Sequence, residues 1–248
     1  MLTRSIFLKK GFTKFKSTES EEHMTYSGTI NKSMLLLVLL LVSCGVSWYL
    51  FLNNQEIALT LLMVGAISGA LIGFITSMKP KIAMFTAPIY TLLEGLFLGG
   101  ISAYFENIVP GIVTSAVLTT LAVCIAVLIV FKYKPGIGHK LKNFIIIATL
   151  SISILYFLNS FLTLIGLPVP YLHNIGPIGI VIDLFIIIII AGNLLLDLQI
   201  IYDGVNINAP KYMEWYASLG MLVTLVFMYT KILELFFKIF GRFLFNKE

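Results

Sequence analysis

Long apolar stretches of the sequence contain the carboxylates of Glu94, Asp183 and Asp197. An ionisable side chain at membrane depth is costly, so it usually faces a cavity, an ion pathway or a partner of opposite charge. Isolated carboxylates in such places can bind a cation or a proton, since either one neutralises the charge. These three residues are therefore the first candidates for function.

Asp183 and Asp197 belong to one apolar stretch and are 14 residues apart, from position 183 to position 197. In a helix this spacing places them on nearly the same face, about 21 Å apart along the axis. Asn193 lies one turn before Asp197 on that face. A cation moving along it would meet one acid and then the other. Asp183 has an alternative placement at the membrane interface, whereas Asp197 is deeper and is the stronger candidate.

Glu94 stands in the middle of another apolar stretch, "APIYTLLEGLFLGG". Tyr90 precedes it by one helical turn, and Gly95 and Gly99 form a pair of small residues that lets a neighbouring helix approach closely. Two interpretations stay open for this carboxylate. It either lines a polar path or serves as a hydrogen-bond partner that holds helices together.

The remaining charges and polar groups of the last two apolar stretches have simpler interpretations. Thr224 and Lys231 share a helix face, and Lys231 precedes Glu234 by three residues, which predicts an ion pair within one helix. Asp203 and Glu214 fall in or beside a connector, so both are expected at the solvated surface.

Several classes of chemistry are excluded by the motifs that the sequence lacks. It contains no HExxH, GxSxG or CxxC motif and no phosphate-binding glycine loop. His23, His139 and His173 all fall outside the apolar stretches, so a catalytic Ser/His pair within the membrane cannot be built. We therefore expect neither an enzyme nor a resident cofactor.

The elements that must position these residues are transmembrane helices. Hydrophobic residues make up 58% of the 248 residues and charged residues 12%, whereas a soluble domain carries about a quarter charged residues. Seven stretches are long enough to cross a hydrocarbon core of about 30 Å. They run near Met34 to Leu52, Ile57 to Met78, Ile82 to Tyr104, Val109 to Phe131, Phe144 to Gly166, Ile175 to Tyr202 and Trp215 to Phe237. The predicted fold class is an all-α membrane protein with seven transmembrane helices.

The basic residues predict how these helices are oriented in the lipid bilayer. Residues 1–33 form a polar, basic segment that is expected to be a cytosolic tail, followed by the seven-helix domain over residues 34–248. Lysine and arginine gather in this tail and in alternate connectors: Arg4, Lys9, Lys10, Lys14, Lys16, Lys32, Lys79, Lys81, Lys132, Lys134, Lys140 and Lys142. The positive-inside rule places the amino terminus in the cytosol. The net charge of +5 thus reflects orientation, and no nucleic-acid partner is expected.

The basic carboxyl-terminal segment conflicts with this orientation. Seven spans would place Lys238, Arg242 and Lys247 on the outer side. Either the last helix ends outside with its basic residues at the interface, or it bends back as a re-entrant segment.

Three stretches together resemble a known family. They are "STESEEHMTYSGTINKS", "APIYTLLEGLFLGGISAYFE" and "LLLDLQIIYDGVNINAPKYMEWYASLGMLVTLVFMY". They are similar to the bacterial branch of the transmembrane Bax inhibitor motif family, also called the Bax inhibitor/YccA family. The resemblance implies six helices around a central seventh, in a multipass protein of the bacterial inner membrane.

The resemblance also implies a pH-sensitive calcium leak channel. Family members carry two aspartates that share a proton and gate the pore, and a basic residue after the second helix that can pair with them. Asp197 matches the first aspartate and is the expected calcium ligand, while Thr224 stands at the second position. Lys79 and Lys81 are the candidates for the closing latch, and Glu94 can supply the missing acid. Because two adjacent carboxylates are what raises one pKa toward neutral, Thr224 argues against that form of gating.

Two other functions stay open beside a calcium or other cation leak. Some relatives bind and modulate a membrane-anchored AAA protease, and the 33-residue tail is a feature that a channel does not need. A proton-coupled transporter is the weaker option, since the sequence has no internal repeat with broken helices.

Overall fold

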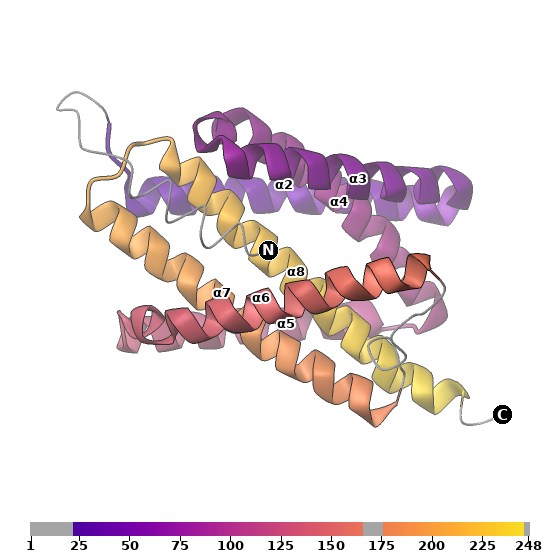
Figure 1. The fold of residues 1–248 in the computed structure, drawn as a ribbon. Helices are drawn as coiled ribbons and strands as arrows, with labels where there is room; N and C mark the ends of the chain where they lie inside the picture. The colour runs from indigo at the N-terminus through magenta and orange to yellow at the C-terminus, as the bar shows by residue number, and fades with distance from the viewer. Residues whose placement is uncertain (1–21, 166–175, 246–248) are drawn as a thin grey trace. The chain divides into compact units, whose positions relative to one another are not determined.

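The computed structural model describes residues 22–165 and 176–245, and these residues are almost entirely helical. Seven of their helices are long and apolar enough to cross a membrane, which confirms the seven predicted spans (Figure 1). They are α2 (Tyr26–Asn53), α3 (Gln55–Met78), α4 (Ala83–Ile108), α5 (Ile112–Tyr133), α6 (Ile137–Leu164), α7 (Pro177–Asn206) and α8 (Met213–Phe245), with a short 3₁₀ helix η1 (Pro80–Ile82) before α4. The arrangement of six helices around the seventh stays a prediction.

The helices from α2 to α6 are separated by very short connectors whose residues suit sharp changes of direction. A single residue, Asn54, separates α2 from α3, and its side chain accepts a hydrogen bond from the Ile57 backbone N–H. Gly111 and Gly136 precede α5 and α6 with φ of 87° and 95°. This left-handed region is unfavourable for residues with a Cβ, which explains glycine at both starts. Even α5, with 22 residues, is about 33 Å long, enough to span the hydrocarbon core.

The chain forms two compact units, and both α7 and α8 contribute to each of them. Among the described residues, the first unit comprises 22–108 and 197–223, that is α2, α3, α4, the end of α7 and the start of α8. The second unit comprises 109–165, 176–196 and 224–245, that is α5, α6 and the remaining parts of α7 and α8.

In the first unit, α4 packs closely against both α2 and α3. A Cβ added to Gly95 of α4 would lie 2.6 Å from the Leu40 carbonyl oxygen of α2, so only glycine fits there. Beside this contact, Ser43 Oγ donates a hydrogen bond to the Leu92 carbonyl oxygen at 2.5 Å. The close helix approach predicted from Gly95 and Gly99 is confirmed, since Gly99 also lies against the α2 backbone.

The first helix begins earlier than the hydropathy pattern predicts. α2 starts at Tyr26, so the boundary expected between residues 33 and 34 falls inside the helix. Thr25 explains the early start, because its side chain caps the helix by accepting a hydrogen bond from the Gly28 backbone N–H at 3.0 Å. Residues 1–21 of the expected tail lie outside the described residues.

The last helix is continuous from Met213 to Phe245. A re-entrant segment would need a break in the helix, so this alternative for the carboxyl-terminal region is wrong. Of the seven candidate spans, the one in α8 has the largest share of buried residues. A helix that is buried around much of its circumference can place polar residues against protein instead of lipid. The buried polar or charged residues of α8 include Glu214, Ser218, Thr224, Lys231 and Lys238.

Candidate functional site

The predicted site residues are divided between the two units. Glu94, Lys79, Lys81 and Asp197 belong to the first unit, whereas Asp183, Asn193 and Thr224 belong to the second. This division does not test the roles predicted for these residues. The contacts and the burial of each residue bear on its role.

Asp197 lies within α7, and only 8% of its surface is exposed. Gln199, two residues further on, is also buried, and its Nε2 donates a hydrogen bond to Asp203 Oδ1 at 3.0 Å. The sequence predicts Asp203 at the solvated surface, but it lies in the last turns of α7 and is partly buried. The end of α7 in the first unit is therefore a polar segment that carries two carboxylates, of Asp197 and Asp203, and two amides, of Gln199 and Asn206.

Glu94 lies in α4 against a glycine of α3. A Cβ added to Gly69 would be 3.4 Å from Glu94 Oε2, and Tyr90 of the preceding turn hydrogen-bonds the Glu94 carboxylate. Tyr90 itself packs over Gly73, also in α3. The missing side chains of the two glycines thus make room for a polar pair between α3 and α4, an arrangement that fits both interpretations of Glu94.

The two latch candidates lie in the connector between α3 and α4, and both are exposed. Lys79 ends α3 with its backbone N–H donating to the Ile75 carbonyl oxygen at 3.1 Å, and Lys81 belongs to η1. The latch itself stays a prediction.

Asn193 and Thr224, both in the second unit, are polar residues without charge. Asn193 Nδ2 donates hydrogen bonds to Thr149 Oγ1 of α6 at 2.8 Å and to the Ile189 carbonyl oxygen at 2.9 Å. Thr224 is buried in α8. Asn193 thus serves as a polar link between α6 and α7.

The described residues contain no group of three or more His, Cys, Asp and Glu side chains that could hold a metal ion. Calcium prefers six to eight oxygen ligands. Among the described residues, Asp197 is therefore not part of such a group of side chains.

The second unit contains a chain of largely buried charged residues, here called the Asp183 network. Lys238 Nζ of α8 lies 2.6 Å from Asp183 Oδ2 of α7 and 3.1 Å from Glu234 Oε1. Glu234 Oε2 in turn lies 2.5 Å from Lys231 Nζ, so the predicted ion pair within this helix is confirmed. Lys231 also donates to the hydroxyl of Tyr156 in α6 at 2.7 Å. Two lysines and two carboxylates thus join three helices.

Lys238 belongs to this network, although the sequence pattern does not predict it there. The pattern assigns it to a basic end of the chain, but its side chain is only 4% exposed. A signal is present in the spacing, since Lys231, Glu234 and Lys238 follow one another at intervals of three and four residues on one helix face. Asp183 is completely buried against Lys238, a partner that neither of its two interpretations includes.

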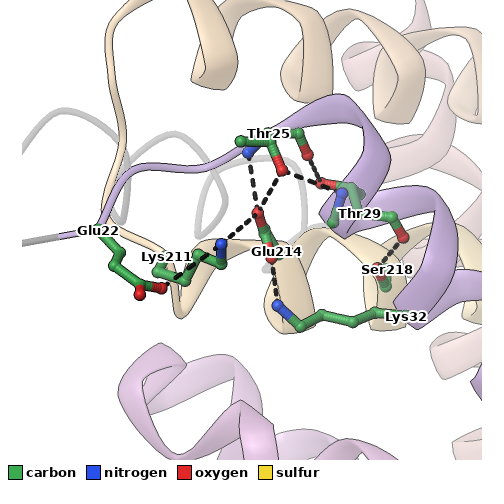
Figure 2. A network of polar contacts seen from close by, with 8 residues as sticks. Glu22, Thr25, Thr29, Lys32, Lys211, Glu214 and Ser218 are labelled. Atoms are coloured by element: carbon green, nitrogen blue, oxygen red, sulfur yellow. Dashed lines mark hydrogen bonds and ion pairs between the residues drawn. The ribbon is translucent and has the colours of Figure 1, made fainter.

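The first unit buries a second charged cluster, here called the Glu214 network (Figure 2). Glu214 is the second residue of α8, and its side chain is 0% exposed, so the expected position at the solvated surface is wrong. Its Oε1 accepts hydrogen bonds from the Thr25 backbone N–H at 2.8 Å and from Thr25 Oγ1 at 3.0 Å. Its Oε2 accepts a hydrogen bond from Lys32 Nζ, with which it forms an ion pair.

Backbone pairing holds the same two segments together. The Met24 N–H donates to the Ala209 carbonyl oxygen at 2.7 Å, and the Lys211 N–H donates to the Glu22 carbonyl oxygen at 2.8 Å. The segment before α2 therefore runs antiparallel to the connector between α7 and α8, around an isolated bridge between His23 and Pro210. This explains the burial of Glu214, because the segment before α2 covers it. No local pattern in the sequence could have revealed a contact over 189 residues.

Comparison with known proteins identifies one family. The family described as Bax inhibitor 1 like matches residues 4–241, nearly the whole chain. No curated protein and no solved structure matches the sequence.

Proposed function

Because the chain belongs to the Bax inhibitor 1 like family, we propose that it is a cation leak channel with calcium as the transported ion. The observation that carries the proposal is the burial of Asp197, a carboxylate in a helix that is otherwise apolar over most of its length. A carboxylate in this position is costly unless it interacts with an ion or a polar partner. In the proposed channel, Asp197 is the gate and the residue that meets the passing cation.

The charge of Asp197 is what selects cations in this mechanism. An ionised carboxylate attracts calcium and replaces part of its water shell, while a protonated one loses that attraction. Glu94 and the Asn193 amide, one turn before Asp197 in α7, are the further candidate oxygen donors, and Lys79 or Lys81 is the candidate counter-ion for closing. Asp183 is better explained by its ion pair with Lys238 than by a place on the ion pathway.

The residue at the second family position changes how the gate responds to protons. Thr224 is buried but cannot carry a negative charge. A single carboxylate lacks the like-charge repulsion that makes one member of a pair bind a proton near neutral pH. The proposed channel therefore depends less on pH than relatives with two aspartates.

Calcium flux into liposomes tests the proposal. The full chain is reconstituted into liposomes loaded with a calcium dye, and Asp197→Asn is compared with Asp203→Asn, a matched change in the same helix. Influx through Asp197→Asn should fall to that of empty liposomes, while Asp203→Asn should transport like the parent. Thr224→Asp should add a steep pH dependence. Equal influx through Asp197→Asn and the parent at every pH would overturn the proposal.

We further propose a bacterial inner membrane as the location, with the amino terminus in the cytosol. The alternation of basic and uncharged connectors supports this orientation. Two exposed positions at opposite ends of the spans suit a labelling test: Asn107 at the end of α4 and Lys134 in a basic connector.

The test introduces Asn107→Cys and Lys134→Cys one at a time, after Cys44 and Cys124 have been replaced by alanine. An impermeant thiol reagent should label Asn107→Cys in intact spheroplasts, and it should label Lys134→Cys only after the membrane is opened. The opposite pattern of labelling would reverse the orientation.

A second candidate is a regulatory protein that binds a membrane protease through its first residues. The observation that favours it is that the segment from Glu22 to Thr25, which directly follows residues 1–21 in the sequence, is held against Glu214 and the connector before α8. A truncation that tests this function must stop at Glu21, since removal of Thr25 would disrupt the Glu214 network. Loss of protease capture with calcium flux retained would support the regulatory role.

A further inference from the structure

The Asp183 network contains two carboxylates that share one ammonium group. Lys238 Nζ lies 2.6 Å from Asp183 Oδ2 and 3.1 Å from Glu234 Oε1. The Asp183 side chain is completely buried, and the Lys238 side chain is nearly so. We propose that Asp183, together with Glu234 and Lys238, forms a proton-binding site in the second unit that is separate from Asp197 and independent of the proposed calcium flux.

Asp183 is the member of the network that accepts the proton. Glu234 lies between two ammonium groups, with Lys231 at 2.5 Å and Lys238 at 3.1 Å, and its side chain is 28% exposed. Among the described residues, Asp183 forms an ion pair with Lys238, and Lys238 also forms an ion pair with Glu234. A negative charge is therefore better stabilised on Glu234 than on Asp183.

The hydrogen bonding of Asp183 supports the same assignment. Its Oδ1 is buried and has no hydrogen-bond partner among the described residues. An ionised carboxylate has about four acceptor positions to satisfy, and leaving them empty in a buried place is costly. A bound proton removes the charge, and with it most of the cost of burial.

The charges around Asp183 determine what proton binding does. From α8 it is faced by Lys231, Glu234 and Lys238, and from α6 the hydroxyl of Tyr156 reaches the network through Lys231. With all four charged groups ionised, the network is neutral. When a proton from water binds the Asp183 carboxylate, the network becomes positive by one charge, and Lys238 loses one of its two carboxylate counter-ions.

A weaker hold on Lys238 is the expected consequence. The residue lies three positions before Gly241, the end of the candidate span, so its long side chain can turn toward the membrane interface. The ion pair between α7 and α8 exists only while Asp183 is ionised. Acid therefore removes this contact, and the second unit responds to pH without a pair of aspartates at the gate.

Infrared spectroscopy of the purified full chain tests the proposal. A protonated carboxyl group that is buried with few hydrogen bonds absorbs at higher frequency than an exposed one, so its C=O band can be followed as the pH falls from about 8 to about 4. The parent should gain such a band. Asp183→Asn should lose it, whereas Glu214→Gln, which alters a buried carboxylate outside the Asp183 network, should keep it.

A second variant keeps the test decisive if Asp183→Asn fails to fold. In Lys238→Met, Asp183 has lost its counter-ion, so its protonated band should already be present at neutral pH. A merely structural role for the ion pair would not produce this band. The proposal is overturned if Asp183→Asn retains the full band, or if the band of Lys238→Met appears at the same pH as that of the parent.

Discussion

The Asp183 network and the Glu214 network each bury a carboxylate beside a lysine, but they satisfy the carboxylate differently. Glu214 accepts two hydrogen bonds from Thr25 and one from Lys32, so both of its oxygens have partners. Asp183 has one lysine at Oδ2 and no hydrogen-bond partner at Oδ1 among the described residues. A fully hydrogen-bonded carboxylate is suited to hold segments together, whereas one that lacks partners is suited to exchange a proton.

The location of the two networks explains this difference. Glu214 stands at the start of α8, where Thr25 of the segment before α2 supplies a backbone N–H and a hydroxyl group as donors. Asp183 lies within the apolar part of α7, where neighbouring helices have their backbone groups already paired. Donors to the Asp183 carboxylate must therefore come from side chains, and the Lys238 side chain reaches it.

Removal of the Glu214 carboxylate should give the largest loss of stability. Glu214→Ala leaves the Lys32 ammonium and the Thr25 donors without their acceptor, which costs about 3 to 5 kcal/mol when a buried ion pair is broken. Thermal unfolding of the detergent-solubilised protein, followed by circular dichroism, measures the loss. Unchanged thermal stability would mean that the segment before α2 is not held by Glu214.

Removal of Lys238 should have a similar effect at neutral pH but a smaller one in acid. Lys238→Met leaves Asp183 without a counter-ion, which costs about 3 kcal/mol at most, because proton uptake by Asp183 in the variant relieves part of the cost. The ion pair contributes stability only above the pH at which Asp183 takes up a proton, so the difference from the parent should shrink as the pH falls. The loss of stability in Lys32→Met, relative to the parent, should change less with pH over that range. If the losses in the two variants depended equally on pH, the two networks would not differ in the way proposed.

A methyl group at Gly28 should disturb the Glu214 network less severely. A Cβ at this position would collide with the Glu214 carboxylate, and such overpacking costs about 1 to 3 kcal/mol. Gly45 of the same helix is the matched control, because a Cβ there meets no atom within 4 Å. Gly45→Ala should be neutral or stabilising by up to about 1 kcal/mol, as expected from helix propensity. Equal thermal stability of the two variants would contradict the packing shown by the structure.

The smallest effect is expected for the exposed ion pair at the edge of the Glu214 network. Lys211 Nζ lies 3.5 Å from Glu22 Oε2, but both side chains are largely in water. Glu22→Gln should therefore change the free energy of unfolding by about 0.5 kcal/mol or less. A larger loss in denaturant unfolding would show that the backbone pairing of this segment depends on the ion pair.

Part of the candidate site can be predicted from the sequence, and the part that cannot has a common cause. The pair of Lys231 and Glu234 is predictable, because both residues belong to one helix turn. The partners of Asp183 and Glu214 are not, because each partner comes from another segment. Helical spacing shows which residues share a face but not which segment that face meets.

The amino-acid sequence by itself determined the seven membrane-spanning helices, since each needs only a stretch of about 20 apolar residues. It also determined the family, through motifs that cover nearly the whole chain. Only the tertiary structure decided that Glu214 is buried and that Asp183 pairs with Lys238. The physical reason is that lipid and protein interior are both apolar, so the pattern of apolar residues does not distinguish the faces of a membrane helix that meet other helices from those that meet lipid.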